Sequence, residues 1–235
     1  MPQADPLTSV ALEEWEDVDE LGPRWAALAA TTTLAGFSDS YWADDDGWHH
    51  LDGGGGVVHL TLLAHGRAVM CGVDQELSAT ADPEQPVDLL SAAPDWVRDL
   101  LDPWPEDLRI DRPGFVYWLD DDDWRRVPYP GDPGEPVPDG ASAIGRFMFD
   151  DDQAAQELLD WATQWIWDAG GVEWEGDEPE LVAAAHTLID DLREPGQERQ
   201  AVVAFLGVLA PGGVVADLDA AAEAAADFTD VLDDD

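Results

Sequence analysis

Two runs of β-branched and aliphatic residues, 57–63 and 68–73, predict the strands of a β-hairpin. The dipeptide His65-Gly66 between them is typical of a two-residue turn, because glycine adopts a positive φ at little cost. This turn predicts a register in which Leu60 faces Cys71 on an apolar face. Cys71 is then expected to be a small, inert core residue.

Polar side chains cluster around the other face of this predicted hairpin. They predict a polar site made of His49, His50, Asp52, His59, Asp74 and Glu76. Imidazole and carboxylate groups suit Zn²⁺, another divalent ion or acid–base chemistry. Their spacing matches no established metal-binding motif, so the presence of a metal stays open. The alternative is that His59 is a strand residue bonded to Asp74.

A second hairpin is predicted from residue 115 to residue 129. An aromatic run, 115–119, and a returning run, 124–129, flank the acidic turn Asp120 to Asp123. The stretch 130–140 that follows has four prolines and three glycines, which is typical of a linker or of a loop over one core. Residues 143–149 are compatible with a further strand.

Helical periodicity governs the rest of the chain. From residue 150 the apolar spacing changes from two to 3.6, which predicts helices over 150–169, 181–192, 197–209 and 214–232. Upstream, the pattern predicts helices over 9–20 and 24–34, and a short one over 94–101. The order of helices, strands and helices indicates an α+β fold. Its mainly antiparallel sheet is built on hairpins 57–73 and 115–129, with N-terminal helices and a C-terminal helical segment.

The same pattern suggests how the chain divides into domains. Residues 1–149 form an α+β domain, and residues 150–235 form a helical segment. That segment either follows a linker at 130–140 or packs on the same core.

The charge of the chain changes this picture. There are 53 acidic residues against ten basic ones, all of them arginine, which gives a net charge of −43. Three interpretations compete: a solvated surface for solubility or high salt, a surface complementary to a basic partner, and mimicry of nucleic-acid phosphates. Direct binding to nucleic acid or to an anionic membrane is disfavoured, because there is no basic patch to neutralise phosphates.

Catalytic and cofactor motifs are hard to find. Gly53 to Gly56 precede a predicted strand and lack a following Gly-Lys-Ser/Thr, so they do not predict a phosphate loop. No Gly-x-Ser-x-Gly nucleophile motif occurs. The balance therefore favours a non-enzyme without a cofactor, although an enzyme stays open.

Cellular location is inferred from similarly simple signals. A single cysteine allows no internal disulfide, and no apolar run approaches 18 residues. A cytoplasmic protein without a membrane span is expected. The oligomeric state is left open.

Tryptophan is abundant, with twelve residues in the chain. Exposed tryptophan among acidic side chains is typical of a protein interface. The predicted partner-binding residues are Trp48, Asp120, Asp121, Asp122, Asp123, Trp161, Trp167 and Trp174. For Trp161 and Trp167 the alternative is a second packing face of their helix against the sheet.

Three short motifs carry a resemblance to a known group of proteins. Asp52-Gly53-Gly54-Gly55, Gly66-Arg67-Ala68-Val69 and the run from Gly72 to Ser78 resemble uncharacterised, acidic, Trp-rich proteins of high-GC bacteria. The resemblance covers about residues 40–100 and implies no activity. In composition and size the chain is also similar to toxin-immunity proteins.

These observations favour an acidic cytosolic binding protein, inhibitor or immunity-like, that masks a basic protein partner. One alternative is a small enzyme or metal-binding domain that uses the face of His59, Asp74 and Glu76. Another is a nucleic-acid mimic, which requires carboxylates in rows at the spacing of phosphates.

Overall fold

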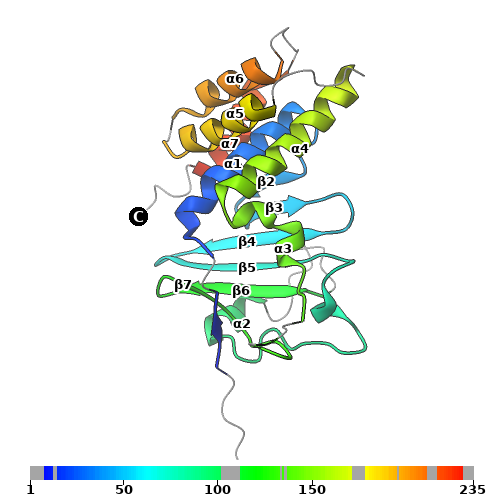
Figure 1. Cartoon of the computed structure of the whole chain (residues 1–235). Coiled ribbons are helices and arrows are strands. Elements are labelled where there is room, and N and C mark those ends of the chain that lie inside the picture. The colour runs from blue at the N-terminus through cyan, green and yellow to red at the C-terminus, as the bar shows by residue number, and fades with distance from the viewer. Residues whose placement is uncertain are drawn as a thin grey trace, which may run out of the picture. The chain divides into compact units, whose positions relative to one another are not determined.

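The computed structural model describes residues 8–12, 15–101, 112–132, 134, 137–170, 178–194, 196–210 and 216–229, and the side chains of 165–170 are not described. The chain divides into two compact units (Figure 1). The first unit contains Met1–Trp15 and His49–Gly145, and the second contains Glu16–Trp48 and Arg146–Asp235. The helical segment predicted at 150–235 therefore falls in the second unit together with residues 16–48.

The structure is an α+β fold with an antiparallel sheet, as predicted. The strands follow the order β1-β7-β6-β5-β4-β3-β2, and the pairs β1–β7, β7–β6, β6–β5 and β5–β4 are antiparallel. Their bounds are β1 (Val10–Ala11), β2 (Tyr41–Asp44), β3 (Gly47–Leu51), β4 (Val57–Leu63), β5 (Arg67–Val73), β6 (Phe115–Asp120) and β7 (Asp123–Arg126).

Helices make up much of the remaining described chain. Their bounds are α1 (Val18–Leu34), α2 (Asp95–Leu101), α3 (Ala141–Ile144), α4 (Asp151–Gly170), α5 (Glu178–Asp191), α6 (Glu198–Leu209) and α7 (Leu218–Thr229). Two short 3₁₀ turns occur at Ala79–Ala81 and Arg146–Met148. None of the helices in the described ranges is both long and apolar enough to cross a lipid bilayer.

The hairpin β4–β5 is present, but its predicted register is wrong by one residue. Leu60 pairs with Met70, and Cys71 pairs with His59. The turn holds three residues, 64–66, instead of two, and both His65 and Gly66 have positive φ. The predicted register was plausible because both faces of the hairpin are largely apolar, so a shift of one residue still matches apolar with apolar.

The second hairpin, β6–β7, is present as predicted, but its second strand ends at Arg126 instead of Tyr129. Asp120 pairs with Asp123, which leaves a two-residue turn. Both turn residues, Asp121 and Asp122, have positive φ, the conformation that type I′ hairpin turns require and that aspartate tolerates. The acidic run is therefore a defined turn.

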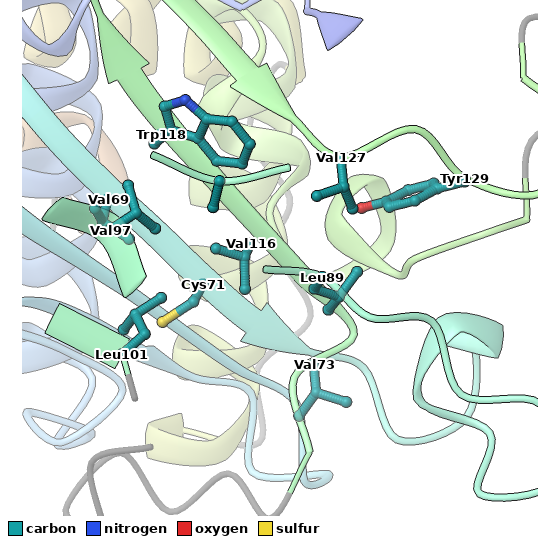
Figure 2. Close-up of a cluster of buried hydrophobic side chains, with 11 residues drawn as sticks. Val69, Cys71, Val73, Leu89, Val97, Leu101, Val116, Trp118, Val127 and Tyr129 are labelled. Carbon is teal, nitrogen blue, oxygen red and sulfur yellow. The ribbon is translucent and has the colours of Figure 1, made fainter. Parts of the chain in front are cut away.

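One face of the sheet in the first unit carries a cluster of buried apolar residues (Figure 2). Helix α2 and the loop before it contribute Leu89, Val97 and Leu101, which pack with side chains from β5 and β6. The strand residues in this cluster are Val69, Cys71, Val73, Val116 and Trp118, and Val127 and Tyr129 extend it beyond β7. Cys71 is fully buried, and burial raises the pKa of its thiol above the ordinary value, so it stays protonated.

The second unit is built around α1, which contacts α4, α5 and α7 (Figure 1). Its run from Trp25 to Ala30 is fully or almost fully buried. Thr31 and Thr32 extend the buried part of the helix, because their hydroxyls donate to the carbonyls of Ala27 and Leu28 at 2.8 and 2.9 Å. The helix thus accommodates polar side chains by bonding them to its own backbone.

Two predicted elements differ from the structure. The helix expected over 9–20 is replaced by the short strand β1, whose Val10 pairs with Arg126, and a helix begins only at Val18. The strand expected over 143–149 is instead the end of α3 followed by a 3₁₀ turn. Runs this short carry too few apolar positions to distinguish the two periods, so tertiary pairing decides.

Gly72 provides a test of the register. A Cβ at this position would lie 2.3 Å from the carbonyl oxygen of Val57 and 2.4 Å from the ring of Phe115. Gly72→Ala is therefore expected to destabilise the first unit by about 1–3 kcal/mol. Urea unfolding followed by tryptophan fluorescence measures the change.

The matched control is Gly54→Ala in the same unit. Its Cβ would meet no atom closer than 3.4 Å, so a change of no more than about 0.5 kcal/mol is expected. Equal stability of the two variants would contradict the observed pairing of Gly72.

Candidate functional site

Two of the predicted polar residues, His49 and His59, meet. Their Nδ1 atoms are 3.1 Å apart, and their ring centroids are separated by 4.5 Å. The Nε2 atom of His59 lies 2.8 Å from the hydroxyl oxygen of Thr61. With both rings neutral, the Nδ1–H group of one ring donates a hydrogen bond to the Nδ1 atom of the other. His59 is only 4% exposed, whereas His49 is half-buried, so the pair lies at the margin of the interior.

The other residues of the predicted polar site do not join this pair. The register places His59 on the face of Cys71, whereas Asp74 follows Val73 by one residue and belongs to the opposite face. Asp74 Oδ1 accepts the backbone N–H groups of Glu76 and Leu77 at 2.9 Å each. Asp74 therefore holds a turn, and the predicted contact with His59 is wrong.

Asp52, His50 and Glu76 also lie apart from the pair of His49 and His59. Asp52 Oδ1 accepts the N–H groups of Gly54 and Gly56 at 2.7 and 2.8 Å, which closes the glycine loop. His50 is buried next to His49 along β3, so the two rings are directed to opposite faces of the strand. Glu76 is exposed. Over the part of the chain that the structure describes, no three His, Cys, Asp or Glu side chains are grouped to hold a metal ion.

The tryptophans that were predicted to bind a partner differ in how exposed they are. Trp48 is 1% exposed and packs between Trp25 and Phe228, with ring centroids 5.9 and 5.5 Å away, so it is a core residue of the second unit. The expectation that it is an exposed anchor is wrong. Trp161 is half-buried and lies 5.6 Å from the ring of Phe37, which is 38% exposed. The side chain of Trp167 and all of Trp174 lie outside the described residues.

The acidic turn of β6–β7 is presented to solvent. Asp121, Asp122 and Asp123 are exposed, and Asp120 is half-buried. Asp123 accepts a hydrogen bond from Arg125 at 2.8 Å, so the chain itself neutralises part of this cluster. The turn is an anionic projection of the first unit.

The arginines are largely paired within the chain. Of the nine arginines that the structure describes, seven form ion pairs with carboxylates of their own unit. These are Arg24, Arg98, Arg125, Arg126, Arg146, Arg193 and Arg199. The most buried is Arg24 at 2% exposure, which bonds Glu16 and, at 2.7 Å, Asp151. Internal pairing thus neutralises most of the positive charge.

A connected polar network lies beyond β7. Arg126 binds both carboxylate oxygens of Asp132 at 2.7 and 3.1 Å, and its guanidinium lies 3.9 Å from the centre of the Tyr129 ring. These hydrogen bonds hold the pKa of Asp132 below its ordinary value. The hydroxyl of Tyr129 donates to Asp139 at 2.8 Å, and that of Tyr117 donates to the same oxygen.

A cleft of about 690 Å³ opens beside this network. One wall comes from the loop 79–91, and the other comes from residues 128–130 together with Val137. Its lining comprises Ala79, Asp82, Gln85, Pro86, Val87, Asp88, Ser91, Pro128, Tyr129, Pro130 and Val137. Its volume lies within the range of small-ligand sites, and two carboxylates and several apolar side chains line it.

Ser78 ties the two walls of the cleft together. Its hydroxyl donates to the carbonyl of Asp139 at 2.5 Å, and the next N–H, of Ala79, donates to the carbonyl of Pro138 at 2.9 Å. A Cβ at Gly140 would come within 2.3 Å of the Ser78 hydroxyl oxygen, and Gly140 also has a φ of +87°. Glycine there permits this close approach of the two segments.

Comparison with known proteins adds no relative. The chain matches no protein-family model, no curated protein and no solved structure at a significant level. The resemblance to acidic, Trp-rich bacterial proteins therefore stays a prediction, and the function has to be argued from the site itself.

Sequence reasoning missed the cleft and the tyrosine network. The stretch 130–140 was interpreted as a linker or loop from its proline and glycine content, and only its tertiary contacts reveal a wall. One local signal was present: Pro-Gly between Tyr129 and Asp132 is a turn signature. It agrees with the hydrogen bond that Asp132 accepts from the Tyr129 N–H at 2.5 Å.

The tyrosine network predicts a loss of stability at alkaline pH. Burial and the negative charge of Asp139 raise the pKa of Tyr117 and Tyr129 above the ordinary value of about 10. The unfolded chain therefore releases these protons first, and the free energy of unfolding should fall as the pH rises above about 10. Below that pH the two groups should contribute no pH dependence.

Tyr129→Phe tests this prediction through urea unfolding between pH 8 and pH 11. The variant should lose about 0.5–1.5 kcal/mol at pH 8, because one hydrogen bond is removed. Above pH 10 its stability should decline less steeply than that of the wild type. An unchanged slope would mean that Tyr129 ionises equally readily in both states.

Proposed function

We propose that this protein is an acidic binding protein, inhibitor or immunity-like, that masks a basic protein partner. The observation that carries the proposal is the internal pairing of the arginines. Seven of the nine arginines in the described ranges bind carboxylates of their own unit, while the chain has 53 acidic residues. The net charge of −43 is therefore displayed with little opposing positive charge.

Such a charge supports rapid and selective encounter with a basic protein. Like charges repel acidic competitors, and complementary potentials raise the association rate at low salt. The exposed turn at Asp121 and Asp122 is the sharpest anionic projection of the first unit. In the second unit, the aromatic pair of Phe37 and Trp161 provides the type of surface that contributes short-range binding energy.

The alternative of a metal-binding or catalytic site lacks the geometry it requires. His59 meets His49, but Asp74 Oδ1 accepts the backbone N–H groups of Glu76 and Leu77 in the turn after β5. Acid–base partners or ligands must converge on one point. The nucleic-acid mimic is kept as an outcome of the binding experiment below.

Affinity capture at 0.15 M NaCl from cells that express the protein tests the proposal. We expect a basic protein in stoichiometric amount that forms a 1:1 complex again when both components are purified. Its affinity should fall on raising the salt to 1 M, where the Debye length is about 3 Å. Isothermal titration calorimetry measures the stoichiometry of the complex and its affinity at each salt concentration.

Polyglutamate of the same net charge is the control. Recovery of the same proteins by polyglutamate, or of none by the protein, would argue against a specific masking function. Recovery of a DNA-binding protein that DNA displaces would favour the nucleic-acid mimic.

The salt dependence of stability separates partner binding from adaptation to a salty environment. Self-repulsion should lower the melting temperature at 0.01 M NaCl, where the Debye length is about 30 Å. We expect a steep rise up to about 0.1 M, followed by a plateau, because the aromatic and aliphatic core holds the fold once repulsion is screened. Differential scanning calorimetry measures the curve, and continued steep stabilisation above 1 M would assign the acidity to the environment.

A further inference from the structure

We propose that the cleft of the first unit binds an arginine or lysine side chain of an extended segment of the protein partner, with Asp82 and Asp88 as the groups that receive the positive charge. This inference rests on the proposed function and identifies one place where the basic partner is held. Both carboxylates line the cleft, together with the ring of Tyr129 and apolar side chains from both walls.

The lining matches the two parts of a long basic side chain. Such a side chain has an apolar stem and a charged head, and it gains most where the stem lies on apolar surface and the head meets a carboxylate. Val87, Pro128 and Val137 provide apolar wall, and Asp82 and Asp88 provide negative charge. An anionic ligand would be repelled by the same two residues.

Local hydrogen bonds orient the two carboxylates but use only one oxygen of each. Asp82 Oδ1 accepts the N–H of Glu84 at 2.8 Å, and Asp88 Oδ1 accepts the N–H of Leu90 at 3.1 Å. These local bonds fix both side chains. Within the described chain, neither Oδ2 has a hydrogen-bond partner and no arginine pairs with either residue. Seven arginines elsewhere do have carboxylate partners, so these two acids retain capacity for an external cation.

The arginine that packs against the cleft residue Tyr129 does not oppose this binding. This residue, Arg126, forms two hydrogen bonds to the carboxylate of Asp132, at 2.7 and 3.1 Å. Its charge is thereby offset inside the fold. The hydroxyl of Tyr129 is likewise held by Asp139, so the ring is fixed in place.

The cleft is also preformed. The bond from the Ala79 N–H to the Pro138 carbonyl joins its two walls, and Val87 packs against the hydrophobic cluster that contains Leu89 and Tyr129. A rigid site loses little conformational entropy on binding, which favours recognition of a short segment. A volume of about 690 Å³ is suited to a side chain together with its neighbouring backbone.

The test uses the full chain labelled with ¹⁵N and the blocked peptide Gly-Ala-Arg-Ala-Gly at 0.05 M NaCl. We expect the peptide to shift the amide signals of residues that line the cleft, among them Asp82, Val87, Asp88, Tyr129 and Val137. Replacing the arginine by citrulline, which keeps the shape and removes the charge, should weaken binding at least tenfold. The double variant Asp82→Asn/Asp88→Asn should weaken it roughly tenfold, because two charge-assisted bonds are lost while asparagine keeps both turn bonds.

The matched control is Asp95→Asn/Asp99→Asn, which removes the same charge from exposed positions of α2. It should change the dissociation constant by no more than about twofold. Equal loss in both double variants, equal binding of the citrulline peptide, shifts confined to other residues, or no binding to the wild type would each overturn the inference. In each of these cases a basic protein captured at 0.15 M salt would leave the proposed function standing, and its absence would remove both.

Discussion

The first unit depends on the antiparallel pairing of β5 with both β4 and β6, which buries both faces of β5. Val69 and Cys71 on one face join the cluster beneath α2, while Ala68 and Met70 on the other face are fully buried. Gly72 has to lack a side chain because Phe115 and the backbone of β4 occupy its space. A strand buried on both sides fixes its neighbours, so the hairpin β6–β7 and the loops that follow it are held to a rigid base.

Charge is the second constraint, because carboxylates greatly outnumber cations. The fold uses its arginines where burial makes a pair necessary: Arg24 lies within the second unit, and Arg126 lies under Tyr129 in the first. A buried guanidinium without a carboxylate would be costly, so these pairs are requirements of the structure. No aspartate or glutamate in the described ranges is fully buried, so the excess of acids gives the protein a strongly anionic character.

Two of these acidic residues, Asp82 and Asp88, line the cleft of the first unit. Asp82 and Asp88 each bind one backbone N–H with one oxygen, and Asp139 holds the hydroxyl of Tyr129, whose ring lines the cleft. Carboxylates on turns of this kind are oriented without being neutralised. The same residue type thus has three roles in one unit: Asp132 pairs with an arginine, Asp139 anchors tyrosines, and Asp82 and Asp88 face the open cleft.

The sequence by itself determined the class of fold, both hairpins, the C-terminal helices and the buried state of Cys71, because strong periodicity and turn residues act locally. The register of β4–β5 was decided by tertiary structure, since both faces are apolar and a three-residue turn shifts every pair by one. The same holds for Trp48, which is core, and for His59, which meets His49 instead of Asp74. The cleft depends on contacts between segments that are far apart in the sequence, such as Ala79 with Pro138, about sixty residues later, and local sequence signals do not specify contacts at that separation.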